Sequence, residues 1–205
     1  MHIVDGALSA PVLVAGAVLS AGGIALGLRR LPVEKIPAAG VLSATFFVAS
    51  LVHVPIGPSS VHLILNGLAG LVLGWAAFPA LFVALLLQAV FFGFGGLTVL
   101  GVNTVNIALP AVVAGLIFGP LIRRSPGFGG VLWGAAGGAF AIAATTGCVA
   151  LALALSGDEF LAAARLVFLA HIPVMAIEAL LTGAAVALIR QVKPALFTPL
   201  QEVRA

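Results

Sequence analysis

The chain has 205 residues, of which 62% are hydrophobic and only 7% are charged, and its mean hydropathy is +1.29. Soluble domains of this size do not have this composition, so the chain is predicted to be a polytopic membrane protein surrounded by lipid. Its formal charge of +3 comes from nine basic and six acidic residues. These are too few and too scattered for a nucleic-acid-binding surface, so no nucleic-acid partner is expected. The single cysteine, Cys148, excludes an intramolecular disulfide.

Seven apolar segments follow one another along the chain, most of them close to the about 20 residues of a membrane-spanning helix. Backbone groups find no water partners in lipid, so helices are the expected form. The predicted fold is therefore all-α: a polytopic membrane bundle of about seven transmembrane helices, with residues 1–205 forming a single domain. The predicted helices cover residues 7–28, 37–54, 60–75, 77–93, 105–122, 129–155 and 161–190.

The basic residues predict the orientation of this bundle. Eight of the nine follow the first, fifth or seventh segment, and only Arg165 falls on the other side. The positive-inside rule therefore predicts an N-terminus outside and a C-terminus in the cytoplasm, for a protein of the inner (plasma) membrane. The eight residues are Arg29, Arg30, Lys35, Arg123, Arg124, Arg190, Lys193 and Arg204.

Three of the four histidines are predicted to lie near the outer membrane face. His2 precedes the first segment, His53 lies at the end of the second, and His62 follows a loop interrupted by Gly57 and Pro58. Irregular backbone at such depth is tolerated only where protein surrounds it. The fourth histidine, His171, is expected about ten residues below this face, and polar groups at such positions are commonly functional.

The first two residues, Met1-His2, carry a group that can chelate a metal. A bulky second residue is expected to prevent removal of Met1, which then keeps its amine. That amine, the backbone nitrogen of His2 and the His2 imidazole can close two fused rings on one ion. A peptide nitrogen loses its proton only to a strongly polarising cation, and planar nitrogen sets suit Ni(II) or Cu(II). We therefore expect a metal bound by Met1 and His2, with His62 as the fourth nitrogen.

Other polar residues on the same face are candidate hydrogen-bond partners of these ligands, or alternative ligands. Asp5 is expected either to orient His2 or to cap the first helix. His53 is expected either to hydrogen-bond a metal-ligating residue or to bind the metal itself. Pro173 is expected to bend the last helix between His171 and Glu178. The sequence assigns no specific role to Glu178. The candidates are Asp5, His53, Ser60, Gln88, Asn103 and His171.

Two other classes of function stay open at this point. A membrane redox protein would bind haem between two histidines, such as His53 and His171, although their predicted depths differ. An intramembrane hydrolase would use Ser59 or Ser60 with His171, which spacing alone does not establish. The sequence has no phosphate-binding loop of the G-x-x-x-x-G-K-[ST] type, so any ATP hydrolysis would require a separate protein.

Four sequence runs resemble a known family. They are MHIVDG at residues 1–6, QAVFF at 88–92, GGLTVLGVN at 95–103 and HIPVMAIE at 171–178. With the lead into His62, they resemble the CbiM/NikM family, the substrate-capture components of nickel/cobalt energy-coupling-factor (ECF) transporters.

The resemblance implies a seven-helix bundle whose N-terminus reaches inward from outside to bind Ni(II) or Co(II) through Met1, His2 and His62. It implies no enzymatic activity. It also implies a transmembrane coupling subunit, cytoplasmic ATPase subunits and, in many members, a small additional membrane subunit. Two departures stand out: residues 56–60 read IGPSS where the family often has PGG-T/S, and Ala179 stands where Gly is common. Ligand chemistry favours Ni over Co and excludes neither Cu nor Zn.

Overall fold

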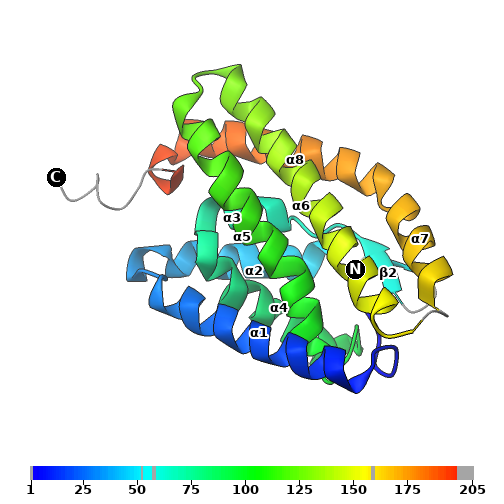
Figure 1. The fold of residues 1–205 in the computed structure, drawn as a ribbon. Coiled ribbons are helices and arrows are strands. Elements are labelled where there is room, and N and C mark those ends of the chain that lie inside the picture. Colours follow the sequence, from blue (N-terminus) through cyan, green and yellow to red (C-terminus); the bar gives the residue numbers. More distant parts are fainter. Residues whose placement is uncertain (1, 52, 57–58, 158–159, 198–205) are drawn as a thin grey trace.

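The structure is a computed structural model that describes the chain except residues 1, 52, 57–58, 158–159 and 198–205, and the side chains of 53–56, 59–61, 161 and 164. The described part is a helical bundle with one short hairpin (Figure 1). Its α-helices are α1 (Ala10–Arg29), α2 (Ile36–Ala49), α3 (Asn66–Leu73), α4 (Ala77–Phe92), α5 (Leu100–Arg124), α6 (Phe128–Ala154), α7 (Leu161–Ala170) and α8 (Ile172–Val192). The hairpin pairs β1 (His53–Ile56) with β2 (Ser59–His62), and short 3-10 turns are η1 (Val33–Lys35), η2 (Gly74–Ala76) and η4 (Pro194–Phe197).

The predicted membrane bundle is confirmed in outline. Among the described residues, five helical stretches are long and apolar enough to cross a bilayer. The helix α2 is not one of them, because its 14 residues extend only about 21 Å, less than the about 30 Å of a hydrocarbon core. The five stretches are Ala10–Arg29, Asn66–Phe92, Leu100–Arg124, Phe128–Ala154 and Arg165–Val192.

Two predicted helices, 37–54 and 60–75, were wrong at the end of the first and the start of the second. The helix α2 ends at Ala49, and the chain then forms an antiparallel hairpin in which His53 pairs with His62. The apolar run contains β-branched residues and is broken by Pro55, Gly57 and Pro58, a composition that disfavours helix and suits a strand pair. His53 is therefore in a strand rather than at a helix end, and His62 ends a strand rather than starting a helix.

The stretch Asn66–Phe92 is not one straight helix. Gly74 has φ +57° and ψ −127°, a conformation that favours glycine, and it separates α3 from α4. His2 contacts both His62, just before α3, and Gln88, in the last turns of α4. The pair α3–α4 therefore enters the bundle and turns back, so that its two ends meet at the same side.

The helix α5 is the centre of the packing and contacts α1, α3, α4 and α6, while α6 packs along α8 (Figure 1). Small residues allow the closest approaches. Gly70 of α3 lies directly against the backbone of Ala111 in α5, and a Cβ on Gly70 would overlap the Ala111 carbonyl oxygen. Such contacts are the usual means of packing helices in membranes, where the hydrophobic effect does not drive them together.

Replacing Gly70 by Ala is therefore expected to push α3 away from α5. We expect a lower midpoint of thermal unfolding in detergent and a lower yield of folded protein. The matched control is Gly147→Ala in α6, where an added Cβ meets nothing within 4 Å. That control should be neutral or more stable by about 0.5–1 kcal/mol, because Ala favours helix over Gly. Equal midpoints for the two variants would contradict this packing.

Candidate metal centre

The segment that follows the N-terminus is buried inside the bundle. His2 is 4% exposed and Ile3 is 0% exposed. Asn103 of α5, itself buried, grips the backbone of Ile3 from both sides: the Ile3 N–H donates to Asn103 Oδ1 at 2.9 Å, and Asn103 Nδ2 donates to the Ile3 carbonyl at 3.0 Å. This pair of hydrogen bonds fixes the chain directly beside His2.

Asp5 is bound at the start of α5, not at His2 or α1 as expected. Its Oδ1 accepts hydrogen bonds from the Thr98 hydroxyl at 2.5 Å and from the backbone N–H of Thr98 and Val99 at 3.2 and 3.3 Å. Its own N–H donates to the Gly95 carbonyl at 3.0 Å. A carboxylate suits this position, where the backbone donors that lead into a helix lack partners within it.

The glycines of the run 95–103 make room for this segment. Gly96 has φ +139°, and a Cβ there would overlap the Asp5 carboxylate. Gly95 has φ +76° and lies against Asn103 and His2. The run GGLT therefore forms the receptor for residues 2–5.

Hydrogen bonds determine the protonation of the His2 ring. Gln88 Nε2 donates to the Phe47 carbonyl at 3.2 Å and to Ser50 Oγ, which orients the Gln88 amide. Its oxygen Oε1 therefore faces His2 Nε2, at 2.8 Å, and can only accept. The His2 proton is thus placed on Nε2, which leaves the lone pair on Nδ1, the atom that can close a chelate ring with the backbone nitrogen.

The His62 ring is fixed in the opposite way. Its Nδ1 lies 2.8 Å from the Leu63 carbonyl, which only accepts, so the proton is on Nδ1 and the lone pair on Nε2. The ring stacks on His2, with 4.7 Å between centroids and 23° between planes. Burial lowers the pKa of His62 well below its ordinary value. Both rings are therefore arranged as neutral imidazoles, the form that binds metals.

His171 is close enough to His62 to influence its charge. It is fully buried at the junction of α7 and α8, and its Nδ1 donates to the Val167 carbonyl at 2.6 Å. Its Nε2 has no hydrogen-bond partner within the described part of the chain. Met1 lies outside the described residues, as do the side chains of His53 and Ser60, so their predicted roles remain predictions.

The structure also shows a residue whose role the sequence did not reveal. Glu178, buried in α8, accepts hydrogen bonds from the backbone of Ile64 and Leu65, just after His62. The described residues contain no cluster of three His, Cys, Asp or Glu side chains that would form a conventional metal site.

Residues 2–196 match the family profile described as "Cobalt uptake substrate-specific transmembrane region", named CbiM. The chain belongs to the CbiM family. The suggested resemblance is thereby confirmed, as is the expected class: a substrate-specific membrane component of cobalt/nickel uptake.

Individual relatives agree with this membership. The chain is 42% identical over 196 residues to a Haemophilus influenzae protein named "Putative metal transport protein", covering 95% of each chain. It is 33% identical to the cobalt transport protein CbiM of Sorangium cellulosum, covering 88% of this chain and 86% of that one. A crystal structure of a transition metal transporter has a TM-score of 0.79 and 27% identity, over 94% of this chain and 93% of that one.

Gly96→Ala is expected to release the N-terminal segment, since the new methyl group would displace the Asp5 carboxylate. We expect hydrogen exchange of the amides of residues 3–8 to become at least about tenfold faster, about 1.4 kcal/mol of lost protection. The control is Gly93→Ala, which also has positive φ but meets nothing within 4 Å. Equal exchange in both variants would mean that backbone strain, not the Asp5 contact, explains the glycine.

Proposed function

We propose that this protein captures Ni(II) or Co(II) from the outer side of the membrane as the substrate-binding subunit of an ATP-driven ECF-type importer. The proposed ligands are the Met1 amine, the backbone nitrogen and Nδ1 of His2, and Nε2 of His62. The observation that carries the proposal is the stacked His2–His62 pair, in which separate hydrogen bonds hold each proton on the nitrogen that the metal does not need.

The chemistry of this ligand set selects the kind of ion. Four nitrogens, one of them a deprotonated peptide nitrogen, favour a strongly polarising ion that tolerates a planar arrangement. Ni(II) fits this set better than Co(II). Burial excludes competing water, and the low pKa of His62 keeps protons from competing for its nitrogen until the pH falls below the ordinary imidazole range.

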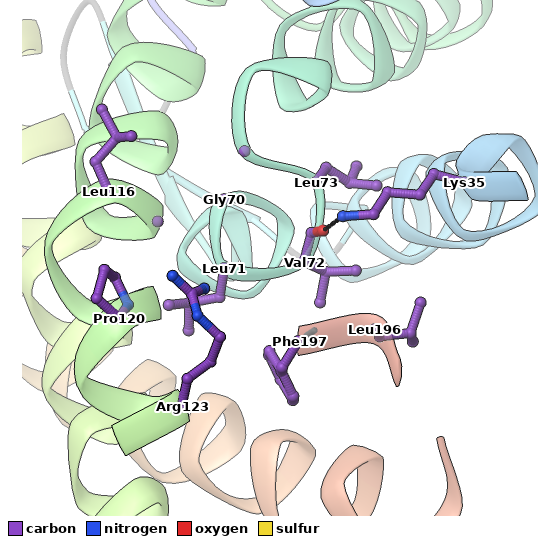
Figure 2. Close-up of a pocket in the computed structure, with 12 residues that line it drawn as sticks. Lys35, Gly70, Leu71, Val72, Leu73, Leu116, Pro120, Arg123, Leu196 and Phe197 are labelled. Carbon is purple, nitrogen blue, oxygen red and sulfur yellow. Dashed lines mark hydrogen bonds between the residues drawn. The ribbon is translucent and has the colours of Figure 1, made fainter. Parts of the chain in front are cut away.

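The proposed orientation, with the N-terminus outside, is supported by the length of α5. Asn103 holds the N-terminal segment, and Arg123 lies 20 residues later on the same helix, hence about 30 Å away, the thickness of a hydrocarbon core. Arg123 and Lys35 line a pocket of about 280 Å³ together with Phe197 (Figure 2). Lys35 Nζ donates to the Val72 carbonyl at 2.9 Å, and its pKa is lowered by burial and by Arg123. We place this basic end at the cytoplasm.

Seven segments fit this orientation if the short helices α2 and α3, neither of which is long enough to cross the hydrocarbon core as a helix, count as partial passages and α7 with α8 counts as one. Three of the outer segments then contribute to the proposed site. The N-terminal segment supplies His2, the hairpin supplies His62, and the loop before α5 binds Asp5. The haem and hydrolase alternatives find no support in the family membership.

The protein would need partners to move the ion inward. We propose a transmembrane coupling subunit and cytoplasmic ATPase subunits, since the sequence itself has no phosphate-binding loop. A further small membrane subunit is supported by relatives such as the fused nickel transport protein NikMN of Rhodobacter capsulatus, 37% identical over 122 residues, 56% of this chain and 35% of that one.

The main test is calorimetric titration of Ni(II) and Co(II) into detergent-purified protein with its native N-terminus. We expect one ion per chain, tighter binding of Ni(II), and a loss beyond about 100-fold in His2→Ala and His62→Ala, more than a mere hydrogen-bond partner of a ligand would cause. The control is Ser20→Ala in α1. It removes a buried hydroxyl that has no hydrogen-bond partner in the described part of the chain. Unchanged binding in both histidine variants would exclude this site.

Gln88→Leu should weaken nickel binding by about 10–100-fold, the usual effect of removing a partner that orients a ligand. The reason is that His2 then loses the acceptor that keeps its proton on Nε2. The same titration measures the effect, with Gln191→Leu at the exposed end of α8 as control. A Gln88 variant that binds like the control would show that the tautomer of His2 is not fixed by Gln88.

A further inference from the structure

Glu178 is a buried carboxylate with an unusual set of partners. It is 0% exposed in α8, and the described residues provide no cation beside it; its hydrogen bonds come from backbone N–H groups. Oε1 accepts from Ile64 at 2.5 Å and from Leu65 at 2.8 Å, and Oε2 accepts from Leu65 at 3.0 Å. A charge buried without a counter-ion is costly, so these bonds compensate a real penalty.

The segment that Glu178 binds has a constrained backbone. Leu65 has φ +54°, the only positive φ of a non-glycine residue in the described part of the chain. For a residue with a Cβ atom this left-handed conformation is unfavourable. It persists because the two N–H groups at Ile64 and Leu65 are both held by one carboxylate, immediately before α3 begins.

The bond to Ile64 connects Glu178 with His62. The N–H of Ile64 and the C=O of Leu63 belong to the same peptide group, which is planar with the two bonds pointing in opposite directions. Glu178 accepts from the N–H end at 2.5 Å, while His62 Nδ1 donates to the C=O end at 2.8 Å. The Leu63–Ile64 peptide group is thus hydrogen-bonded at both ends, to Glu178 at its N–H and to His62 at its C=O.

We propose that Glu178 is a positioning residue of the metal centre, which acts through the Leu63–Ile64 peptide group to fix the orientation and tautomer of His62. The inference rests on the proposed function, since it assigns a role toward the same ligand. A carboxylate at the N–H end fixes the direction of the peptide and polarises it, so the Leu63 oxygen becomes a better acceptor. The His62 Nδ1–H bond is strengthened, and Nε2 becomes a better oriented and more basic ligand.

The same connection makes α8 part of the site. Glu178 lies two turns after His171 on one helix, and α8 extends from there to Arg190, at the end that we place in the cytoplasm. A displacement of α8 relative to α3 would pull on the Leu63–Ile64 peptide and rotate the His62 ring. The ligand geometry is therefore sensitive to the position of a helix that contributes no metal ligand itself.

The test begins with a measurement that needs no metal. In protein labelled with ¹⁵N-histidine, the ring nitrogen shifts report which nitrogen carries the proton, and the His62 signals are assigned by their absence in His62→Ala. We expect Nδ1–H in the wild type and a shift toward Nε2–H in Glu178→Leu. Thr182→Val, one turn later on α8, removes a buried hydroxyl without a described partner and should leave His62 unchanged.

Nickel titration of the same variants gives the functional readout. Glu178→Leu should bind about 10–100-fold more weakly than the wild type, and Thr182→Val should bind like it. Glu178→Gln keeps an oxygen acceptor for Ile64, but without charge its hydrogen bonds are about half as strong, so we expect a partial rescue between these limits. If Glu178→Leu does not fold, the nickel affinity and His62 tautomer of Glu178→Gln alone test the proposal.

The inference is overturned if His62 keeps its wild-type tautomer and nickel affinity in the folded Glu178 variants. Failure of the metal proposal gives a different pattern. A wild-type protein that binds no nickel, but whose His62 tautomer still changes in Glu178→Leu, would refute metal capture and retain Glu178 as the residue that orients His62.

Discussion

The two hydrogen bonds between Asn103 and the backbone of Ile3 are the constraint on which the rest of the site depends. A chain terminus inside a membrane protein has backbone groups that lipid cannot satisfy, so it stays buried only if the protein supplies partners. Asn103 provides a donor and an acceptor at once, and Asp5 binds the start of α5 a few residues later. Between these anchors and the bundle, His2 has little freedom. The proposed site would therefore depend on the docking of the segment that contains His2, Ile3 and Asp5.

Neutral hydrogen-bond acceptors fix the tautomers of the two imidazoles. Gln88 holds the proton of His2 on Nε2, and a peptide carbonyl holds that of His62 on Nδ1. Among the described carboxylates, Asp5 binds residues at the start of α5, and Glu178 is connected to His62 through the Leu63–Ile64 peptide group. A divalent ion that displaces one peptide proton would add one net positive charge to the buried space instead of two, which lowers the penalty of burying it.

Much of the bundle followed from composition, because long apolar runs have few other ways to satisfy their backbone. Asn103 and Gln88 could also be singled out, as polar residues in otherwise apolar helices. The hairpin was missed because its strands are too short and apolar to separate from the helices beside them. The roles of Asp5 and Glu178 were out of reach: each bonds backbone groups about a hundred residues away, and backbone donors carry no sequence signal.

The central claim is that the amino terminus itself is a metal ligand, and it is tested most directly by changing only that group. Nickel affinity should be compared between protein with a native Met1 amine and protein carrying Gly-Ser ahead of Met1, which converts the amine into a peptide nitrogen. The account predicts that the extended protein stays folded and loses more than about 100-fold in affinity, since a chelating nitrogen contributes more than an outer partner does. Equal affinity of the two proteins would contradict it and move the site to the side chains alone.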